Sequence, residues 1–212
     1  ALSRGSVEDV LDRYYQAAKA NQAAVVVRIT ADCPLIDPQL IDQAVNTMLS
    51  SQTDKRSHSA EHFDFIANRL PQPWWRTYPI GLDTEVFTFA ALERAWMEAK
   101  ESHQREHVTP FFYEDVPADD LKFSTNLVPL AMAQSPRGFV IGLLHYVEEL
   151  GHQRWTVDTP DDLELMRQIA ALLPDDDFTW RDVLELVEKH PELTQINAQI
   201  EHKTHLDVDK RA

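Results

Sequence analysis

The sequence of residues 24–37, AVVVRITADCPLID, determines the fold that we predict for the rest of the chain. It begins with a run of small and β-branched residues, Ala24–Ile29, which predicts a strand buried on both faces, as in the middle of a parallel sheet. The run ends in a carboxylate, Asp32, and a proline two residues later prevents the sheet ladder from continuing. Asp37 and Pro38 then predict a helix start, with the aspartate as N-cap and the proline at the first helical position. Because open α/β sheets bind ligands where parallel strands end, Asp32 is the first candidate site residue.

The composition is that of an ordinary globular protein. The chain has 212 residues, of which 43% are hydrophobic and 26% charged, so a single large core is within reach. A net charge of -15 argues against binding to a nucleic acid polymer, which requires clustered lysine and arginine. The single cysteine, Cys33, excludes an internal disulfide and fits a reducing compartment. Without an apolar run of about 20 residues or a secretory signal, we expect no membrane partner and a cytoplasmic location.

Hydrophobic periodicity along the chain predicts an α/β architecture. Further strands are expected at residues 63–67, 81–87, 121–128, 138–144 and 154–158. Helices are expected at residues 7–20 (capped by Ser6), 38–49, 88–100, 111–113, 160–172 and 180–189, with another beginning at Pro191. Thr88 is the expected cap of the third helix, and the Thr-x-x-Asp patterns at Thr159 and Thr179 predict the starts of the helices at 160 and 180. We predict one α/β domain over residues 1–175 and a C-terminal helical appendage of the same domain over residues 176–212. The five glycines form neither a P-loop nor a dinucleotide-binding fingerprint.

Two acids share one setting. Asp32 and Asp158 each stand where a β-rich run stops, shortly before a proline and a helix. In a parallel sheet both would lie at the carboxyl edge, and two converging carboxylates suit Mg²⁺, which keeps waters and lets substrate phosphates complete its shell. The alternative is that both are only N-caps of the helices that follow, and spacing alone favours that alternative.

Three weaker patterns also carry chemistry. The acids of Gly81–Glu85 could bind sugar hydroxyls or simply face solvent, and the pattern alone favours solvent. In Arg105–His107, a histidine beside an acid could act as a general base or could belong to a solvated helix end. Cys33 lacks a second cysteine and an adjacent base, so a buried thiol is favoured over a nucleophile.

Five stretches together resemble one family. They are Arg4–Tyr14, Arg28–Asp37, Tyr78–Phe87, Arg105–Pro110 and Arg154–Leu163. In this order they resemble the spore coat polysaccharide biosynthesis cytidylyltransferases, a family similar to the CMP-ketodeoxyoctonate and acylneuraminate cytidylyltransferases. The resemblance extends from the first of these stretches to about Ile200.

The resemblance implies a fold and an activity. The fold is the nucleotide-diphospho-sugar transferase fold (glycosyltransferase-A-like), a three-layer α/β/α sandwich with a mainly parallel sheet. The activity is Mg²⁺-dependent transfer of CMP from CTP to a sugar acceptor in surface polysaccharide biosynthesis, with release of pyrophosphate. Asp32 resembles the metal-binding aspartate of the family's Asp-x-Pro-Leu-Ile motif, and Asp158 resembles the second metal-binding aspartate. Both are therefore expected as catalytic and metal-binding residues.

The resemblance also implies binding residues and partners. Arg28, Thr30 and Asp32 are expected at the cofactor site. Residues expected at the acceptor site are Arg76, Tyr78, Gly81, Asp83, Glu85, Glu106 and His107. The partners are CTP and a sugar, and the oligomeric state stays open, with a homodimer as one candidate.

The chain departs from the family at its start. Family members begin with a strand and a loop whose arginine, serine and lysine residues hold the triphosphate, whereas this sequence begins just before Arg4. We therefore expect the N-terminal part of the domain to be missing, which leaves nucleotide preference and the activity of this chain open. Two alternatives remain: a glycosyltransferase of the same fold, and a non-catalytic fragment.

Overall fold

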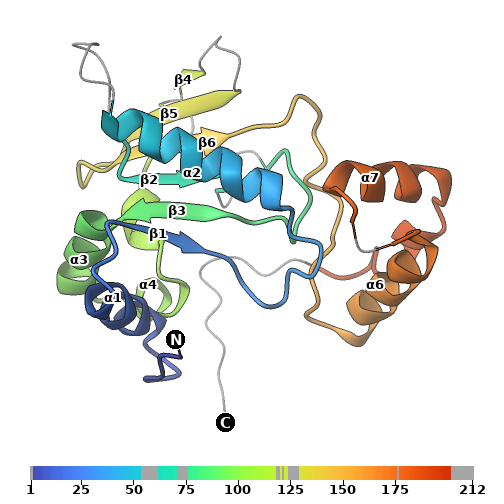
Figure 1. Cartoon of the computed structure of the whole chain (residues 1–212), viewed down its shortest axis with the longest axis horizontal. Helices are drawn as coiled ribbons and strands as arrows, with labels where there is room; N and C mark the ends of the chain where they lie inside the picture. The colour runs from blue at the N-terminus through green and yellow to red at the C-terminus, as the bar shows by residue number, and fades with distance from the viewer. Residues whose placement is uncertain are drawn as a thin grey trace.

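The computed structural model describes residues 2–53, 62–70, 76–117, 120, 122–123, 129–175 and 177–201. Six strands form one sheet in the order β1-β3-β2-β6-β5-β4 (Figure 1). The strands are β1 (Val25–Arg28), β2 (Phe65–Ala67), β3 (Glu85–Thr88), β4 (Lys122–Phe123), β5 (Leu130–Gln134) and β6 (Val140–Leu144). The helices are α1 (Val10–Ala20), α2 (Pro38–Thr53), α3 (Phe89–Glu98), α4 (Ser102–His107), α5 (Pro110–Tyr113), α6 (Pro160–Leu172) and α7 (Trp180–Lys189), followed by the 3₁₀ helix η2 (Leu193–Gln195).

Helices cover both faces of the sheet, which confirms the α/β sandwich. Successive residues of a strand point to opposite faces, so Ile66 and Val86 join a cluster with α2 on one side. Phe65 and Phe87 join a second cluster with α1, α3 and α5 on the other side. None of the helices in the described residues is long and apolar enough to span a bilayer.

The direction of the strands corrects one prediction. Only β2 and β6 pair in parallel among the described strands, whereas β1·β3, β2·β3, β5·β6 and β4·β5 are antiparallel pairs. The expectation of a mainly parallel sheet is therefore wrong for neighbouring strands, because β3 inserts between β1 and β2 in the reverse direction. The unpredicted β5 likewise reverses next to β6. The strands β1, β2, β4 and β6 nevertheless all run the same way.

The position of β1 corrects another prediction. The strand lies at one end of the sheet, and β3 alone pairs with it in the described part of the chain. Val27 is 39% exposed, and Ile29, just after the strand, is 44% exposed. The expectation of burial on both faces is wrong here, because a β-branched run fits an edge strand as well as a central one.

Several element boundaries also differ from the predicted ones. Asp9, not Ser6, caps α1 by accepting a hydrogen bond from the backbone of Asp12 at 2.9 Å. The predicted strand at residues 154–158 is reduced to a single bridge between Arg154 and Ile80. The predicted strand at 81–87 begins only at Glu85, and η2 stands where a helix from residue 191 was expected. Of the predicted strand at 121–128, β4 is present and the remainder lies outside the described residues.

The C-terminal helices share a core with the loops at the end of the sheet. Trp155 and Trp180 are fully buried in a cluster that also contains Leu82, Leu165 and Val183. This cluster spans residue 175, and the predicted division of the chain there stays a prediction.

One carboxylate joins α2 to α7. Asp37 is buried; its Oδ1 accepts a hydrogen bond from the backbone of Gln39 at 2.6 Å, and its Oδ2 accepts one from the backbone of Trp180 at 2.9 Å. The predicted cap of α2 is thus confirmed, and the same side chain also binds the first N–H group of α7.

Replacing this carboxylate will destabilise the protein. Asp37→Ala removes both hydrogen bonds, so we expect the free energy of unfolding, measured by urea denaturation, to fall by about 2–4 kcal/mol. Asp42→Ala, an exposed aspartate on the same helix, is the control and should change it by no more than about 0.5 kcal/mol. Equal effects of the two substitutions would show that Asp37 does not join the helices.

Candidate functional site

The carboxyl ends of β1, β2 and β6 meet at one edge of the sheet. Arg28 of β1, Glu85 of the reversed strand β3, Ala67 of β2 and Leu143 of β6 follow one another across the sheet in register. In Figure 1 the arrows of β1, β2 and β6 point toward α6 and α7. The chain segments that leave the sheet at this edge carry most of the predicted site residues.

The structure brings the two predicted metal ligands to neighbouring segments. The carbonyl oxygen of Asp32 accepts a hydrogen bond from the backbone of Val157 at 2.8 Å and another from the hydroxyl of Thr156 at 3.0 Å. Asp158 is the next residue along the chain. The loop after β1 and the segment before α6 are therefore joined at the positions of the two acids.

Neither acid is a helix cap. The N-cap of α6 is Thr159, whose hydroxyl accepts from the backbone of Asp162, and the N-terminal backbone of α2 is bound by Asp37. The capping alternative is therefore wrong for both Asp32 and Asp158. The carboxylates of Asp32 and Asp158 therefore have no role in starting these helices.

The two carboxylates lie in different surroundings. Asp32 is half-buried, and the Sγ atom of Cys33 lies 3.6 Å from its Oδ1. The side chain of Asp158 is 43% exposed, and its Oδ2 accepts a hydrogen bond from Nη2 of Arg154 at 2.6 Å. Asp158 therefore has one oxygen committed to an arginine within the protein.

The donor set of this site is small. The described residues contain no group of three or more histidine, cysteine, aspartate or glutamate side chains that could hold a metal ion. Two carboxylates on joined segments are nevertheless the number of protein ligands that Mg²⁺ commonly takes, with waters and substrate phosphates completing its shell. The residues present fit that ion, and the metal role of Asp32 and Asp158 stays a prediction.

Glu85 lies at the centre of a buried network of charges. It is 1% exposed; its Oε2 pairs with Nη1 of Arg28 at 2.6 Å, and its Oε1 accepts from the hydroxyl of Thr109 at 2.9 Å. Arg69 lies 3.5 Å from the same carboxylate. Burial is the largest single influence on the pKa of Arg28 and lowers it, but the charge of Glu85, the charge of Tyr14 and the hydrogen bond to Glu85 together outweigh burial, so the pKa is raised. Arg28, predicted at the cofactor site, is thus held by a protein carboxylate.

Asp83 joins this network at its outer side. Arg76 binds both carboxylate oxygens of Asp83, with Nη2 to Oδ2 at 3.0 Å, and Nε of Arg69 lies 3.5 Å from Oδ2. The side chain of Asp83 is partly exposed, whereas that of Glu85 is not. The favoured expectation that these acids face solvent is therefore wrong for Glu85. Of the two acids, Asp83 is the one that a ligand can reach.

Cys33 is buried beside the site. Burial raises the pKa of its thiol to about 12, and the charges of Asp83 and Asp32 act in the same direction. The hydroxyl of Thr30, also predicted at the cofactor site, lies 3.3 Å from the sulfur. The interpretation as a buried thiol is confirmed, because a thiol with this pKa is protonated at neutral pH and is a poor nucleophile.

Tyr78 and Gly81, both predicted at the acceptor site, pack the neighbouring loops together. The hydroxyl of Tyr78 donates to the carbonyl oxygen of His145 at 3.3 Å, and burial raises its pKa to about 12. Gly81 has a φ of +102°, and a Cβ atom there would lie 2.5 Å from the carbonyl oxygen of Trp155. A glycine is therefore required where this loop crosses the segment that leads to Asp158.

The Arg105–His107 triplet lies on α4. Arg105 binds Asp9 through Nε at 3.1 Å and the carbonyl oxygen of Trp96 through Nη1 at 2.8 Å, so it ties α4 to α1 and α3. Glu106 and His107 are half-buried and lie three and two residues, respectively, before Thr109, whose hydroxyl binds Glu85. Their predicted place at the acceptor site and the base role of His107 stay predictions.

Three residues at this edge were not predicted as site residues. Arg154 holds Asp158, Asp162 holds Arg154, and Asn197 holds Asp162. The Thr-x-x-Asp pattern that starts α6 predicts a helix start and nothing about the site. No pattern in the sequence points to Asn197, which lies 35 residues beyond its partner.

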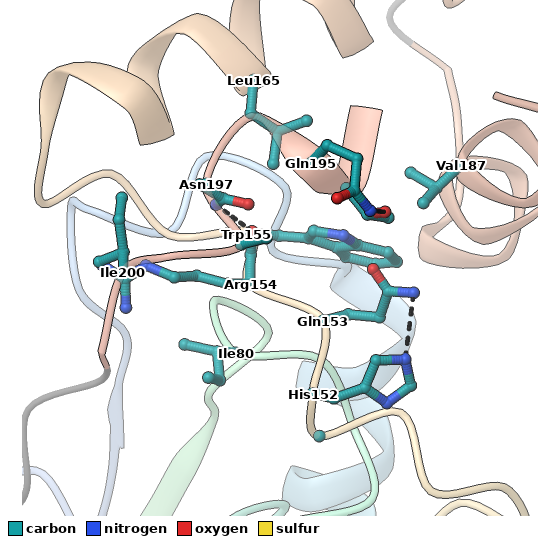
Figure 2. Close-up of a pocket in the computed structure, with 13 residues that line it drawn as sticks. Ile80, His152, Gln153, Arg154, Trp155, Leu165, Val187, Gln195, Asn197 and Ile200 are labelled. Carbon is teal, nitrogen blue, oxygen red and sulfur yellow. Dashed lines mark hydrogen bonds between the residues drawn. The ribbon is translucent and has the colours of Figure 1, made fainter. Parts of the chain in front are cut away.

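A cavity lies behind this segment. Figure 2 shows Arg154, Trp155 and Asn197 among its lining residues, together with side chains of α6, α7 and η2. Its volume is about 400 Å³, and neither Asp32 nor Asp158 lines it. The cavity is therefore distinct from the junction between the two segments that carry Asp32 and Asp158.

Comparisons with known proteins agree on one family. A family model described as "Cytidylyltransferase" matches residues 1–135. The chain is 26% identical over 193 residues to the spore coat polysaccharide biosynthesis protein SpsF of Bacillus subtilis, covering 89% of this chain and 65% of SpsF. It is 33% identical over 207 residues to the uncharacterized protein MJ1063 of Methanocaldococcus jannaschii, covering 98% of this chain and 71% of that protein.

A solved structure supports the same relationship. The structure of a cytidylyltransferase from Leptospira borgpetersenii serovar Hardjo-bovis matches with a TM-score of 0.72 and 27% sequence identity. The match covers 94% of this chain and 70% of that chain. The absence of an N-terminal part, expected from the sequence, stays a prediction.

Removing the charge of Glu85 will destabilise the protein. Glu85→Gln leaves Arg28 and Arg69 without their buried counter-charge, so we expect the free energy of unfolding to fall by about 3 kcal/mol or more. The control is Glu98→Gln, which breaks an exposed pair with Arg94 and should cost no more than about 0.5 kcal/mol. If both variants unfold at the same urea concentration as the wild type, the network contributes nothing to stability.

Proposed function

Because the chain belongs to the cytidylyltransferase family, we propose that it transfers CMP from CTP to a hydroxyl group of a sugar, with release of pyrophosphate. The name of the relative SpsF supports surface polysaccharide biosynthesis as the setting. The observation that carries the proposal is the junction between Asp32 and the Thr156–Val157 segment, which brings two otherwise unexplained acids to one sheet edge.

The reaction exchanges one phosphorus–oxygen bond for another. The acceptor oxygen forms a bond to the α-phosphorus of CTP while the bond from that phosphorus to the pyrophosphate oxygen breaks, and the hydroxyl proton passes to water. Catalysis of such a transfer depends on positioning and on neutralising phosphate charge rather than on covalent chemistry. A site with rigidly held polar groups therefore suffices.

Asp32 and Asp158 are the residues that would hold Mg²⁺. When bound, that ion supplies positive charge that offsets the charge of the phosphates. The chain's own part is to keep the two carboxylates in place. It does so through the hydrogen bonds from Thr156 and Val157 to the backbone of Asp32, and through the pairing of Asp158 with Arg154.

The acceptor would approach from the side of Asp83. This carboxylate is partly exposed and is held by Arg76 and Arg69, so it can accept hydrogen bonds from sugar hydroxyls without first being oriented. Glu85 is enclosed behind it and supports the arginines. Glu106 and His107 on α4 are assigned to the same side of the site.

Asp32→Asn will abolish the reaction without unfolding the protein. We expect pyrophosphate release from CTP, measured with a panel of neutral and acidic sugars and Mg²⁺, to fall at least about 100-fold, because the variant loses a charge that holds the cation. Asp42→Asn, an exposed aspartate on α2, is the control and should retain full activity.

Two outcomes would contradict the proposal. One is pyrophosphate release by Asp32→Asn at the wild-type rate. The other is sugar transfer from a nucleotide sugar in place of pyrophosphate release from CTP, which would identify a glycosyltransferase.

A further inference from the structure

The carboxylate of Asp158 is bound by Arg154, whose guanidinium group is also bound by Asp162. Nη2 of Arg154 donates to Oδ2 of Asp158 at 2.6 Å and to Oδ2 of Asp162 at 2.9 Å, and its Nε donates to Oδ1 of Asp162 at 2.9 Å. The guanidinium thus forms a two-pronged pair with Asp162 and extends one further hydrogen bond to Asp158. Such a planar fork restricts the orientation of the guanidinium.

Asp162 is held as firmly as the arginine. It is fully buried, and Asn197 donates a hydrogen bond to its Oδ1 at 2.9 Å. Asn197 donates another to the carbonyl oxygen of Arg154 at 3.0 Å (Figure 2). The Oδ2 atom of Asp162 also accepts hydrogen bonds from the backbone N–H groups of Asp158 at 3.1 Å and of Thr159 at 3.0 Å. Asp162 is therefore held by Arg154, by Asn197 and by the start of α6, and it is the buried ion-pair partner of Arg154.

Helix capping does not account for this cluster. The helix α7 begins with the same capping box, in which Thr179 and Asp182 bind each other's backbone, as Thr159 and Asp162 do at α6. Asp182 is exposed, and its carboxylate accepts hydrogen bonds from the backbone and the hydroxyl of Thr179, the N-cap of its own helix. A capping box can therefore form without a buried arginine. Burying Arg154 has a desolvation cost, and the need to cap α6 does not explain why the protein bears that cost.

We propose that Arg154, fixed by Asp162 and Asn197, is the positioning residue for the carboxylate of Asp158. This inference rests on the proposed function, in which Asp158 holds the divalent cation. The arginine fixes one oxygen of Asp158 and so sets the orientation of the whole carboxylate, as hydrogen-bonding partners of metal-ligating carboxylates do.

Asp162 has a second, electrostatic effect. Its charge offsets that of Arg154, so the three side chains together carry one negative charge, which remains available to a cation. Without the charge of Asp162, the guanidinium would neutralise Asp158 itself. Removing that charge is therefore expected to weaken cation binding, although Asp162 does not face the site.

The test measures binding of Mn²⁺, a probe for Mg²⁺, to the full chain by electron paramagnetic resonance of the free ion. Asp158→Asn should abolish the binding, and Asp162→Asn should weaken it at least about fivefold. Asp182→Asn, the matched substitution in the capping box of α7, should leave the dissociation constant within about twofold of the wild-type value. Thermal unfolding establishes that each variant is folded at the assay temperature.

Arg154→Lys supplies a second test in case Asp162→Asn does not fold. It keeps the charge but cannot hold two carboxylates in the plane of a fork, so Mn²⁺ binding should weaken at least about threefold. Wild-type binding by Asp162→Asn and by Arg154→Lys would overturn the positioning role, and so would equal weakening by Asp182→Asn. Undiminished binding by Asp158→Asn would instead overturn the proposed metal site, and the positioning role with it.

Discussion

The carbonyl oxygen of Asp32 accepts hydrogen bonds from two groups of a segment far away along the chain, the backbone N–H of Val157 and the hydroxyl of Thr156. The proposed pairing of Asp32 with Asp158 depends on this contact. It joins the loop after β1, which carries Asp32, to the segment before α6, which carries Asp158. It also connects this edge of the sheet to the cluster in which α6 and α7 are packed. Losing these hydrogen bonds would be unfavourable, because a backbone carbonyl group that is buried without a hydrogen-bond partner destabilises the folded protein.

The charges at the sheet edge are arranged in two layers. Glu85 lies inside, enclosed by Arg28 and Arg69, and Asp83 lies outside, where Arg76 and Arg69 hold it in partial contact with solvent. Glu85 holds Arg69 from inside, and Arg69 and Arg76 in turn hold Asp83, so the outer acid has a fixed position and still contacts solvent. The same arrangement recurs at Arg154, where a buried acid, Asp162, holds the arginine that contacts the more exposed Asp158.

Local signals predicted the helices well and the sheet less well. Asp37, Thr88, Thr159 and Thr179 mark helix starts through contacts within a few residues, and all four are confirmed. Strand direction and the edge position of β1 depend on pairing between distant segments, which periodicity does not encode. The sequence indicated Asp32 and Asp158 as a pair but could not separate capping from other roles, since the residues that cap α2 and α6 lie nearby. Asn197 could not have been predicted, because its partners Arg154 and Asp162 are distant along the chain.

The most direct test of the account is the position of a divalent cation in crystals of the chain soaked with Mn²⁺ and CTP. The anomalous difference density of Mn²⁺ should show a peak within bonding distance of carboxylate oxygens of both Asp32 and Asp158. A Mn²⁺ peak bound elsewhere, touching neither acid, would contradict the claim that the junction of these two segments forms the nucleotide-transfer site.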